Sequence, residues 1–151
     1  MANEKQFKLN TKIFAVRGVY EYRLTIPALV NQNDRILEVG CEWGTTSRMI
    51  HEQCQDLIAT DISAKVLLKA KNINPEINFK VLDIYDVKSA MALNFDFNKM
   101  YVDVSGFSGY KSVLDVLSIL NMYSTVFELD LIVVKSGALK QLFRNGVAWK
   151  E

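Results

Sequence analysis

Four acidic residues, each at or near the end of a short apolar segment, are the residues of this sequence best placed to do chemistry. Glu38 stands just before a glycine-bearing turn, and Asp61, Asp83 and Asp103 each follow an apolar run. A single Asp in such a position is more simply explained as the cap of the next helix. Four in succession favour one shared site, because carboxylates accept hydrogen bonds from hydroxyl and amino groups and attract a positively charged ligand.

The turn after the first apolar segment contains Gly40 and Gly44 and leads directly into a predicted helix. Glycine lets a backbone adopt positive φ and pass close to a ligand, although two glycines can equally serve a tight turn and nothing more. The turn lacks the G-x-G-x-x-G spacing of dinucleotide binders. Glu38 and Glu42 would also repel a pyrophosphate at the start of the helix. The turn therefore favours a cationic or zwitterionic ligand and argues against a dehydrogenase.

The spacing of the acids suits a nucleoside. Asp61 comes 23 positions after Glu38, near the offset of about 20 residues at which an acid reaches ribose hydroxyls in βαβ nucleoside sites. Two carboxylate oxygens match a vicinal diol, and Asp83 is placed to accept from an adenine amino group. Capping of the helices that follow is the alternative role for both aspartates.

The elements that must position these acids alternate along the chain. Five apolar segments predict strands: RILEVG (35–40), DLIATD (56–61), INFKVLD (77–83), NKMYVDV (98–104) and DLIVVKS (130–136). Helices are predicted over 16–30, 44–53, 63–73, 86–94, 109–126 and 137–145. The apolar residues of the strands are nearly consecutive, as in strands buried on both faces of a parallel sheet. We expect an α/β, doubly wound, mostly parallel five-stranded sheet in the order 3-2-1-4-5, with helices on both faces and the ligand at the carboxyl ends of the strands.

Composition narrows the class of protein further. The 151 residues, half of them hydrophobic, suit a single domain over residues 1–151. A net charge of +1 provides no overall field toward nucleic acid or a membrane. Two cysteines and one histidine favour neither a structural zinc site nor a disulfide framework. No apolar run approaches the roughly 20 residues of a membrane helix, so we expect a soluble, cytoplasmic protein with no membrane partner.

On these motifs the sequence resembles the class I (Rossmann-like) S-adenosylmethionine-dependent methyltransferases, over about residues 34–136. EVGCEWG resembles the first motif of that family, and TDIS with Asp61 resembles its ribose-binding second motif. VLDIYD with Asp83 is similar to the adenine-contacting segment, and YVDVSG with Asp103 is similar to the motif beside the methyl donor. An acid-rimmed site without a phosphate cradle also suits a sulfonium and an ammonium better than a nicotinamide dinucleotide.

The resemblance implies S-adenosyl-L-methionine as cofactor, S-adenosyl-L-homocysteine as product, and methyl transfer to an acceptor that the sequence does not identify. It places Gly40, Cys41 and Gly44 along the methionine part and Ile62 against adenine, with the second-motif acid on the ribose and the third on the adenine amino group. The predicted cofactor-binding residues are Glu38, Gly40, Cys41, Gly44, Asp61, Ile62, Asp83, Ile84 and Asp103.

Two departures from the family pattern stand out. Glu42 occupies the place of the usual central glycine of the first motif. The family's sheet normally continues through two further strands that form a terminal hairpin, and only GALKQLFRNGVAWKE follows the fifth predicted strand here. The chain is therefore interpreted as a short member of the family or as a fragment.

Asp103 and Lys135 are the predicted catalytic residues, because they end neighbouring predicted strands and a hydroxyl acceptor needs help with its proton. An Asp with a Lys in a VVK segment is similar to the heat-shock type of ribosomal RNA 2′-O-methyltransferase, which gives one alternative function. A structural ion pair without a catalytic role would leave the same two residues in the sequence. A non-catalytic scaffold that only binds the donor is a further alternative function. A small molecule or an RNA is the expected acceptor.

The fifth predicted strand lies at the edge of the expected sheet, with one row of backbone groups unpaired. Proteins cover such an edge with another segment or dimerise across it. The segment QFKLNTKIFAV (6–16) has some β character and is a candidate cover. We expect either a homodimer through this edge or a cover supplied by the chain's own ends, with the dimer favoured.

Overall fold

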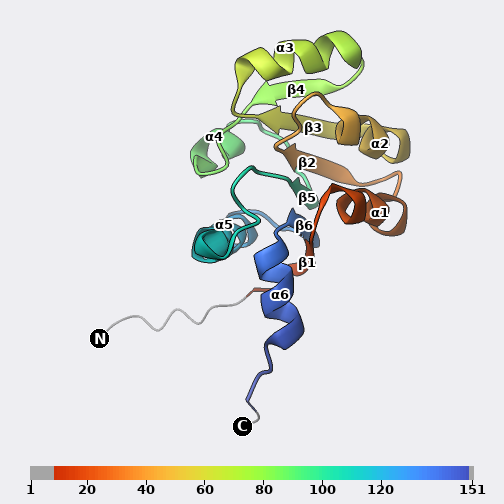
Figure 1. Ribbon diagram of the computed structural model, residues 1–151. Coiled ribbons are helices and arrows are strands. Elements are labelled where there is room, and N and C mark those ends of the chain that lie inside the picture. The colour runs from red at the N-terminus through yellow and green to blue at the C-terminus, as the bar shows by residue number, and fades with distance from the viewer. Residues whose placement is uncertain (1–8, 150–151) are drawn as a thin grey trace.

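Six parallel strands form the central layer of the computed structural model, which describes residues 9–149 (Figure 1). The strands are β1 Lys12–Val16, β2 Arg35–Val39, β3 Asp56–Asp61, β4 Asn78–Val81, β5 Lys99–Val102 and β6 Leu131–Lys135. Their order in the sheet is β1-β6-β5-β2-β3-β4. The five predicted segments all form strands, and β2, β5 and β6 are buried along most of their length, as their continuous apolar runs predict.

The expected number of five strands is wrong, because a sixth strand, β1, extends the sheet; the five predicted strands keep their expected relative order. β1 pairs with β6 from Lys12 opposite Leu131 to Val16 opposite Lys135. Its apolar Ile13, Phe14 and Ala15 fit the edge that β6 would otherwise leave open. The predicted dimer through an exposed β6 edge is therefore corrected: the chain's own N-terminal segment covers that edge. Residues 6–8 of the predicted cover lie outside the described residues.

Helices cover both faces of the sheet (Figure 1). They are α1 Val19–Leu29, α2 Thr45–Gln53, α3 Ala64–Ile73, α4 Val87–Met91, α5 Val113–Val126, which follows the 3-10 turn η1 Tyr110–Ser112, and α6 Gly137–Asn145. The first three pack on one face of the sheet through Tyr22, Ile50 and Leu67. The other face is covered through Ala90 of α4 and Val116 of α5. Within residues 9–149, no helix combines the length and apolar character needed to cross a membrane.

The amino ends of the strands are closed by a buried polar network. Lys99 Nζ lies 2.6 Å from the Asp34 carboxylate and donates to the Leu29 carbonyl at 2.6 Å. Asn98 donates to Asp34 at 3.0 Å and to Asp130 at 2.9 Å. Burial raises the pKa of Asp34, but the hydrogen bonds from Lys99 and Asn98 outweigh it, so the pKa is lowered overall. The buried Asp34 and Lys99 side chains therefore both have protein partners.

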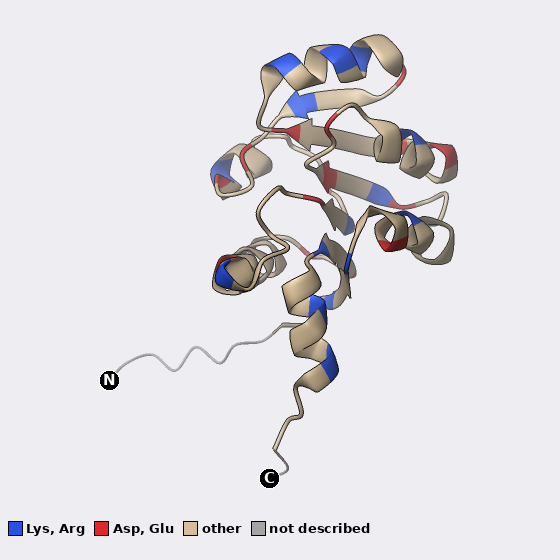
Figure 2. Cartoon of the chain, viewed as in Figure 1, with Lys and Arg blue, Asp and Glu red and all other residues tan. Residues whose placement is uncertain are grey.

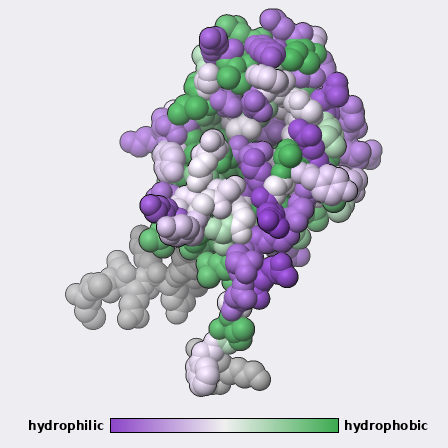
Figure 3. All heavy atoms as spheres, in the orientation of Figure 1, coloured by the Kyte–Doolittle hydropathy of each residue, from purple (hydrophilic) through white to green (hydrophobic). Residues whose placement is uncertain are grey.

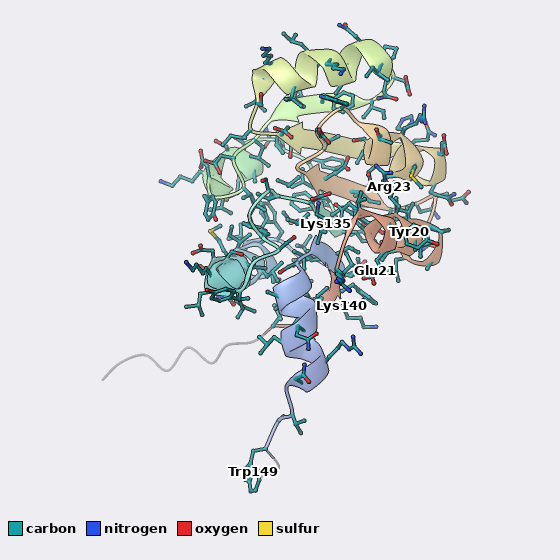
Figure 4. All side chains as sticks on the ribbon, viewed as in Figure 1. Tyr20, Glu21, Arg23, Lys135, Lys140 and Trp149 are labelled. Atoms are coloured by element: carbon teal, nitrogen blue, oxygen red, sulfur yellow. The ribbon has the colours of Figure 1, made fainter. Side chains whose placement is uncertain are left out.

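The carboxyl ends of the strands gather the predicted acids. Figure 2 shows acidic segments at the arrowheads of β2 and β3, which lie side by side in the sheet. Near the same end of the sheet, α6 packs against β1 and α5 and projects from the body of the molecule (Figure 1). Beyond it, Val147 and Trp149 are 93% and 95% exposed, and Trp149 lies at the far end of this projection (Figure 4).

Candidate functional site

The loop after β2 is held against β5 by a glycine. Gly40 has φ +85°, and a Cβ built on it would overlap the carbonyl oxygen of Asp103. The Asp103 N–H donates to the Val39 carbonyl at 2.9 Å just beside it. Any other residue at position 40 would force β2 and β5 apart at their carboxyl ends. The close approach that the sequence predicts at Gly40 is therefore made to the chain itself.

The remainder of the loop turns into α2. Gly44 has φ +81° and stands at the N-cap of α2, where a Cβ would meet Asn74 and Phe79 at 2.8 and 2.9 Å. Glu42, in the place of the usual glycine, adopts φ 49°, a left-handed conformation that non-glycine residues reach at some cost. Its backbone N–H donates to Asp61 Oδ2 at 3.1 Å, which ties the loop to the end of β3.

Asp61 is fixed by two backbone amides. Besides the amide of Glu42, Ser63 N–H donates to Asp61 Oδ1 at 2.9 Å. The cap of α3 is Ser63, whose Oγ accepts from Val66 N–H at 3.3 Å, so the capping role considered for Asp61 belongs to its neighbour. Each carboxylate oxygen has a second lone pair. Asp61 is thus held in place and still able to accept from a ligand.

An apolar cavity of about 200 Å³ opens between the carboxyl ends of β2, β3 and β4. Its lining residues are Val39, Gly40, Asp61, Ile62, Leu82, Asp83, Ile84, Tyr85 and Val104. Aliphatic side chains form most of its walls, and the two aspartates are the charged residues among those lining it. Asp83 Oδ1 accepts from Tyr85 N–H at 3.0 Å, which orients the carboxylate. We call this space the apolar cavity.

A second and smaller cavity of about 60 Å³ lies on the other side of Gly40, which lines both spaces. Its lining residues are Val19, Tyr22, Arg23, Glu38, Gly40, Cys41, Glu42, Trp43, Thr45, Thr46 and Asp103. Most of these side chains are polar or charged, so we call it the polar cavity. Arg23 is oriented by donating from Nε to Thr46 Oγ1 at 3.1 Å.

Buried ionisable groups line the polar cavity. Glu38 is 1% exposed and accepts from Ser47 Oγ. Burial raises its pKa to about 7, helped by the nearby charge of Asp103 and opposed by the Ser47 hydrogen bond. Burial also raises the pKa of Cys41, which keeps that residue a packing thiol. The Tyr22 hydroxyl is fully buried and has no hydrogen-bond partner in the described part of the chain.

Asp103 and Lys135 form an ion pair at the ends of β5 and β6; Figure 4 labels Lys135. Their side chains are 18% and 25% exposed, which is intermediate between a core pair and a surface pair. Asp103 lines the polar cavity, whereas Lys135 lines neither cavity and meets the site through Asp103. The contact fits both interpretations of the sequence, a structural pair and a pair at a reaction centre.

The structure brings most of the predicted site residues together. Gly40, Asp61, Ile62, Asp83 and Ile84 line the apolar cavity, and Glu38, Gly40, Cys41 and Asp103 line the polar one. The predicted cofactor-binding residue that lines neither is Gly44, which shapes the turn instead. Over residues 9–149, no group of three or more His, Cys, Asp or Glu side chains is arranged to hold a metal ion.

Sequence reasoning did not assign any residue of α1 to the cofactor-binding site. Tyr22 and Arg23 reach the polar cavity from a helix that precedes every recognised motif. The available signal is the segment predicted as a helix over 16–30, which offers neighbouring aromatic and cationic side chains. Tyr85 and Leu82 of the apolar cavity were also missed, although they flank Asp83 in the VLDIYD motif.

No protein-family model matches this chain. No curated protein matches it in sequence either. Solved structures do match in fold. A TehB-like S-adenosylmethionine-dependent methyltransferase from Corynebacterium glutamicum is 20% identical, with 78% of this chain and 62% of that chain covered and a TM-score of 0.55. DesVI from Streptomyces venezuelae is 19% identical, with 75% and 50% covered and a TM-score of 0.55.

Fibrillarin from Aeropyrum pernix, solved with natively bound S-adenosyl-L-methionine, is 16% identical, with 66% of this chain and 47% of that chain covered and a TM-score of 0.50. The chain spans between 47% and 62% of the length of these three structures. At such identities the likeness concerns the arrangement of strands and helices. The chain therefore has the fold of the class I S-adenosylmethionine-dependent methyltransferases over the part of these structures that it spans.

Proposed function

We propose that this protein binds S-adenosyl-L-methionine across the apolar and polar cavities and transfers its methyl group to an acceptor. The observation that carries the proposal is the pair of cavities of opposite character that adjoin at Gly40. The donor also has an apolar and a polar part: its nucleoside, with a flat apolar base, is joined through a sulfonium to a zwitterionic amino acid. Solved structures of the same fold, one with the donor bound, add support.

The apolar cavity suits adenosine. Ile62 and Ile84 offer aliphatic surface to the adenine ring, and Asp83 accepts from the amino group of the base. Asp61, already fixed by two backbone amides, accepts from the ribose hydroxyls with its remaining lone pairs. A hydrogen bond to a charged group of this kind contributes roughly 1.5–3 kcal/mol.

The polar cavity suits the amino acid end. Arg23 provides a guanidinium for the carboxylate, and Asp103 and Glu38 provide negative charge for the ammonium. The unpartnered hydroxyl of Tyr22 gains a hydrogen-bond partner there. Gly40, which lines both cavities, then lies beside the sulfonium.

The chemistry asks little of the protein when the acceptor is already nucleophilic. The bound donor supplies a methyl group activated by the positive charge on sulfur. A lone pair of the acceptor forms the new bond to the methyl carbon, the carbon–sulfur bonding pair remains on sulfur, and the acceptor loses a proton. The protein aligns the acceptor with the methyl–sulfur axis. For a hydroxyl acceptor, we assign the removal of that proton to Lys135 and Asp103.

Calorimetry and a methylation assay test the proposal in sequence. S-adenosyl-L-methionine and S-adenosyl-L-homocysteine should bind with one site per chain, and NAD should not bind, because Glu38 and Glu42 repel its pyrophosphate. If neither S-adenosyl-L-methionine nor S-adenosyl-L-homocysteine binds, the proposal is overturned. Methyl-labelled donor is then incubated with separated nucleic acid, protein and metabolite extracts. Label in one fraction identifies the acceptor class, whereas donor binding without transfer to any fraction indicates a donor-binding scaffold.

A further inference from the structure

A third cavity, of about 400 Å³, lies past the carboxyl ends of β1 and β6 and is lined by Arg17, Glu21, Gly137, Lys140, Gln141 and Arg144. Neither donor cavity includes any of these residues. The position follows from the sheet register. Val16 pairs with Lys135 and accepts a hydrogen bond from Ser136 N–H at 2.9 Å, so Arg17 and Gly137 stand side by side immediately beyond Lys135. We call this space the basic cavity.

The basic cavity has an excess of positive charge. Three cationic side chains face one carboxylate, that of Glu21. Glu21 lies 2.7 Å from Lys140 Nζ and accepts from the Arg17 backbone N–H at 2.8 Å (Figure 4). Those two hydrogen bonds lower the pKa of Glu21. Glu21 thereby positions Lys140 and the backbone of Arg17 without neutralising the Arg17 guanidinium.

Two guanidinium groups are left for a ligand. Among residues 9–149, no carboxylate lies within ion-pair distance of the side chain of Arg17 or Arg144. Arg144 follows Lys140 by one helical turn on α6, a helix that carries no acidic residue (Figure 2). Figure 3 shows hydrophilic side chains gathered along this helix. Guanidinium groups bind phosphate oxygens through paired hydrogen bonds, and the start of α6 adds its own positive potential.

From this geometry we infer that the basic cavity holds the phosphate group of a small phosphorylated methyl acceptor, an inference that rests on the proposed methyl transfer. The phosphate is bound by Arg17, Arg144 and Lys140, and the remainder of the acceptor extends past Lys135 toward the donor. These three cationic side chains line a single cavity, and the net charge of the chain is only +1. A site of this size favours one phosphate group over the extended backbone of a nucleic acid.

Inorganic phosphate is the probe for the first experiment. It is titrated into the full-length protein at constant ionic strength, with chloride as the reference anion, and backbone amide shifts are recorded by NMR. Saturable shifts are expected at Arg17, Gly137 and Gln141. The variant R17Q/R144Q should bind phosphate at least about tenfold more weakly, because it loses two charge-assisted contacts. The matched control K65Q/K71Q removes two positive charges from the distant helix α3 and should leave phosphate binding unchanged.

Two readouts separate this inference from the proposed function. S-adenosyl-L-homocysteine should bind R17Q/R144Q as tightly as the wild type, because the donor cavities are intact. Donor binding without saturable phosphate binding, or phosphate binding that R17Q/R144Q retains, overturns the inference alone. Phosphate binding without donor binding overturns the proposed function and, with it, the assignment of the phosphate to a methyl acceptor.

The source of the phosphate is tested with a short oligoribonucleotide that lacks terminal phosphates. If it shifts the same amides and binds at least about tenfold more tightly than inorganic phosphate, the ligand is a nucleic acid backbone and the small-molecule assignment is wrong. In the labelled-extract assay, phosphatase treatment of the metabolite fraction should abolish methyl incorporation, whereas nuclease treatment should not. Incorporation that survives phosphatase contradicts the inference.

Discussion

Two Asp–Lys ion pairs lie at opposite ends of the same sheet and differ in their surroundings. At the amino ends, Asp34 and Lys99 are each 8% exposed, and neighbouring amide and carbonyl groups complete their hydrogen bonding. At the carboxyl ends, Asp103 and Lys135 are 18% and 25% exposed, and Asp103 borders the polar cavity. The first pair is enclosed by protein, whereas the second presents a charged group to a cavity. The same pair of residue types is therefore suited to stability at one end and to ligand chemistry at the other.

The buried carboxyl groups of the two ends differ in the same way. Hydrogen bonds from Lys99 and Asn98 more than offset the burial of Asp34 and lower its pKa. Burial dominates at Glu38 and raises its pKa to about 7. The carboxylate of Asp34 is favoured by folding and that of Glu38 is disfavoured. An unfavourable carboxylate is tolerated where a cationic ligand would compensate for it, and the predictions below test this contrast.

Replacing Lys99 with Met should have the largest effect, a loss of about 3–5 kcal/mol in the free energy of unfolding, because it leaves the Asp34 carboxylate buried and unpaired. Urea denaturation measures the loss. Adding Asp34→Asn to Lys99→Met removes the unpaired charge and should recover part of it. Arg35→Gln is the control, since it breaks the exposed pair with Asp96 and should cost at most about 1 kcal/mol. A similar cost for Lys99→Met and Arg35→Gln would contradict this account of the amino end.

Replacing Lys135 with Met should instead affect turnover. For a hydroxyl acceptor we expect a loss of about 100-fold in turnover, with the affinity for S-adenosyl-L-homocysteine within a few-fold of the wild type. Stability should fall by only about 1 kcal/mol, because the pair is partly solvated. Steady-state kinetics and calorimetry on the same preparation separate the two effects. If turnover and donor binding fall together, or neither falls, Lys135 has no part in the reaction.

The Glu38 carboxyl should make the free energy of unfolding depend on pH with a sign opposite to that of Asp34. Because its pKa is raised from 4.5 to about 7 in the folded state, its contribution to stability is complete below pH 4.5 and is lost as the pH rises through 7. Glu38→Gln removes this decline. Relative to the wild type, the variant should gain ~2–3 kcal/mol in the free energy of unfolding between about pH 5 and pH 8. A constant difference between the two proteins over that range would show that Glu38 does not titrate there.

The sequence predicts those parts of the fold and of the candidate site that depend on residues close together in the chain. Continuous apolar runs indicate the five central strands, and the acids at their ends indicate where the site lies. The sequence marks β1 only as a candidate edge cover, because its burial is partial and becomes apparent only against β6. The pairing of Asp34 with Lys99 leaves no signal in the sequence, since 65 positions separate the two residues.

The same reason explains the missed part of the candidate site. Asp61 ends β3 and Asp83 closely follows β4. The carboxyl ends of parallel strands meet at one edge of the sheet, so the proximity of these two aspartates is predictable. Tyr22 and Arg23 reach the polar cavity only because α1 packs beside α2. Packing between helices is set by many side chains together, and no spacing rule in a single sequence reports it.

Asp61→Ala tests the carboxyl end through binding. The substitution should weaken S-adenosyl-L-methionine binding about tenfold to a hundredfold, the equivalent of roughly 1.5–3 kcal/mol, because a charged acceptor for the ribose is lost. Asp56→Ala is the matched control, since Asp56 begins the same strand at the opposite end of the sheet and is exposed. Calorimetry should find its affinity unchanged. Equal affinities for the folded Asp61→Ala protein and the wild type would remove Asp61 from the donor site.

The smallest expected effect concerns the Tyr22 hydroxyl. Tyr22 and Tyr101 pack edge to face with ring centroids 5.4 Å apart, yet of the two only Tyr101 has a hydroxyl partner among the described residues, Thr25 Oγ1 at 3.2 Å. Both hydroxyls are removed by substitution with Phe. Tyr101→Phe should destabilise the protein by about 1 kcal/mol, because a hydrogen bond is lost. Tyr22→Phe should stabilise the protein without ligand by about 1 kcal/mol, because a buried hydroxyl without a partner is costly.

The ligand should narrow the difference in unfolding free energy between these two variants, from about 2 to about 1 kcal/mol. If the Tyr22 hydroxyl bonds to the methionine part of the donor, Tyr22→Phe should weaken S-adenosyl-L-homocysteine binding about fivefold, the equivalent of ~1 kcal/mol, while Tyr101→Phe leaves it unchanged. Urea denaturation with and without the product measures both effects in one series. Equal destabilisation by the two substitutions would mean that the Tyr22 hydroxyl already has a partner in the folded protein. The polar cavity would then lack the unpaired group that distinguishes it from the closed network at the amino end.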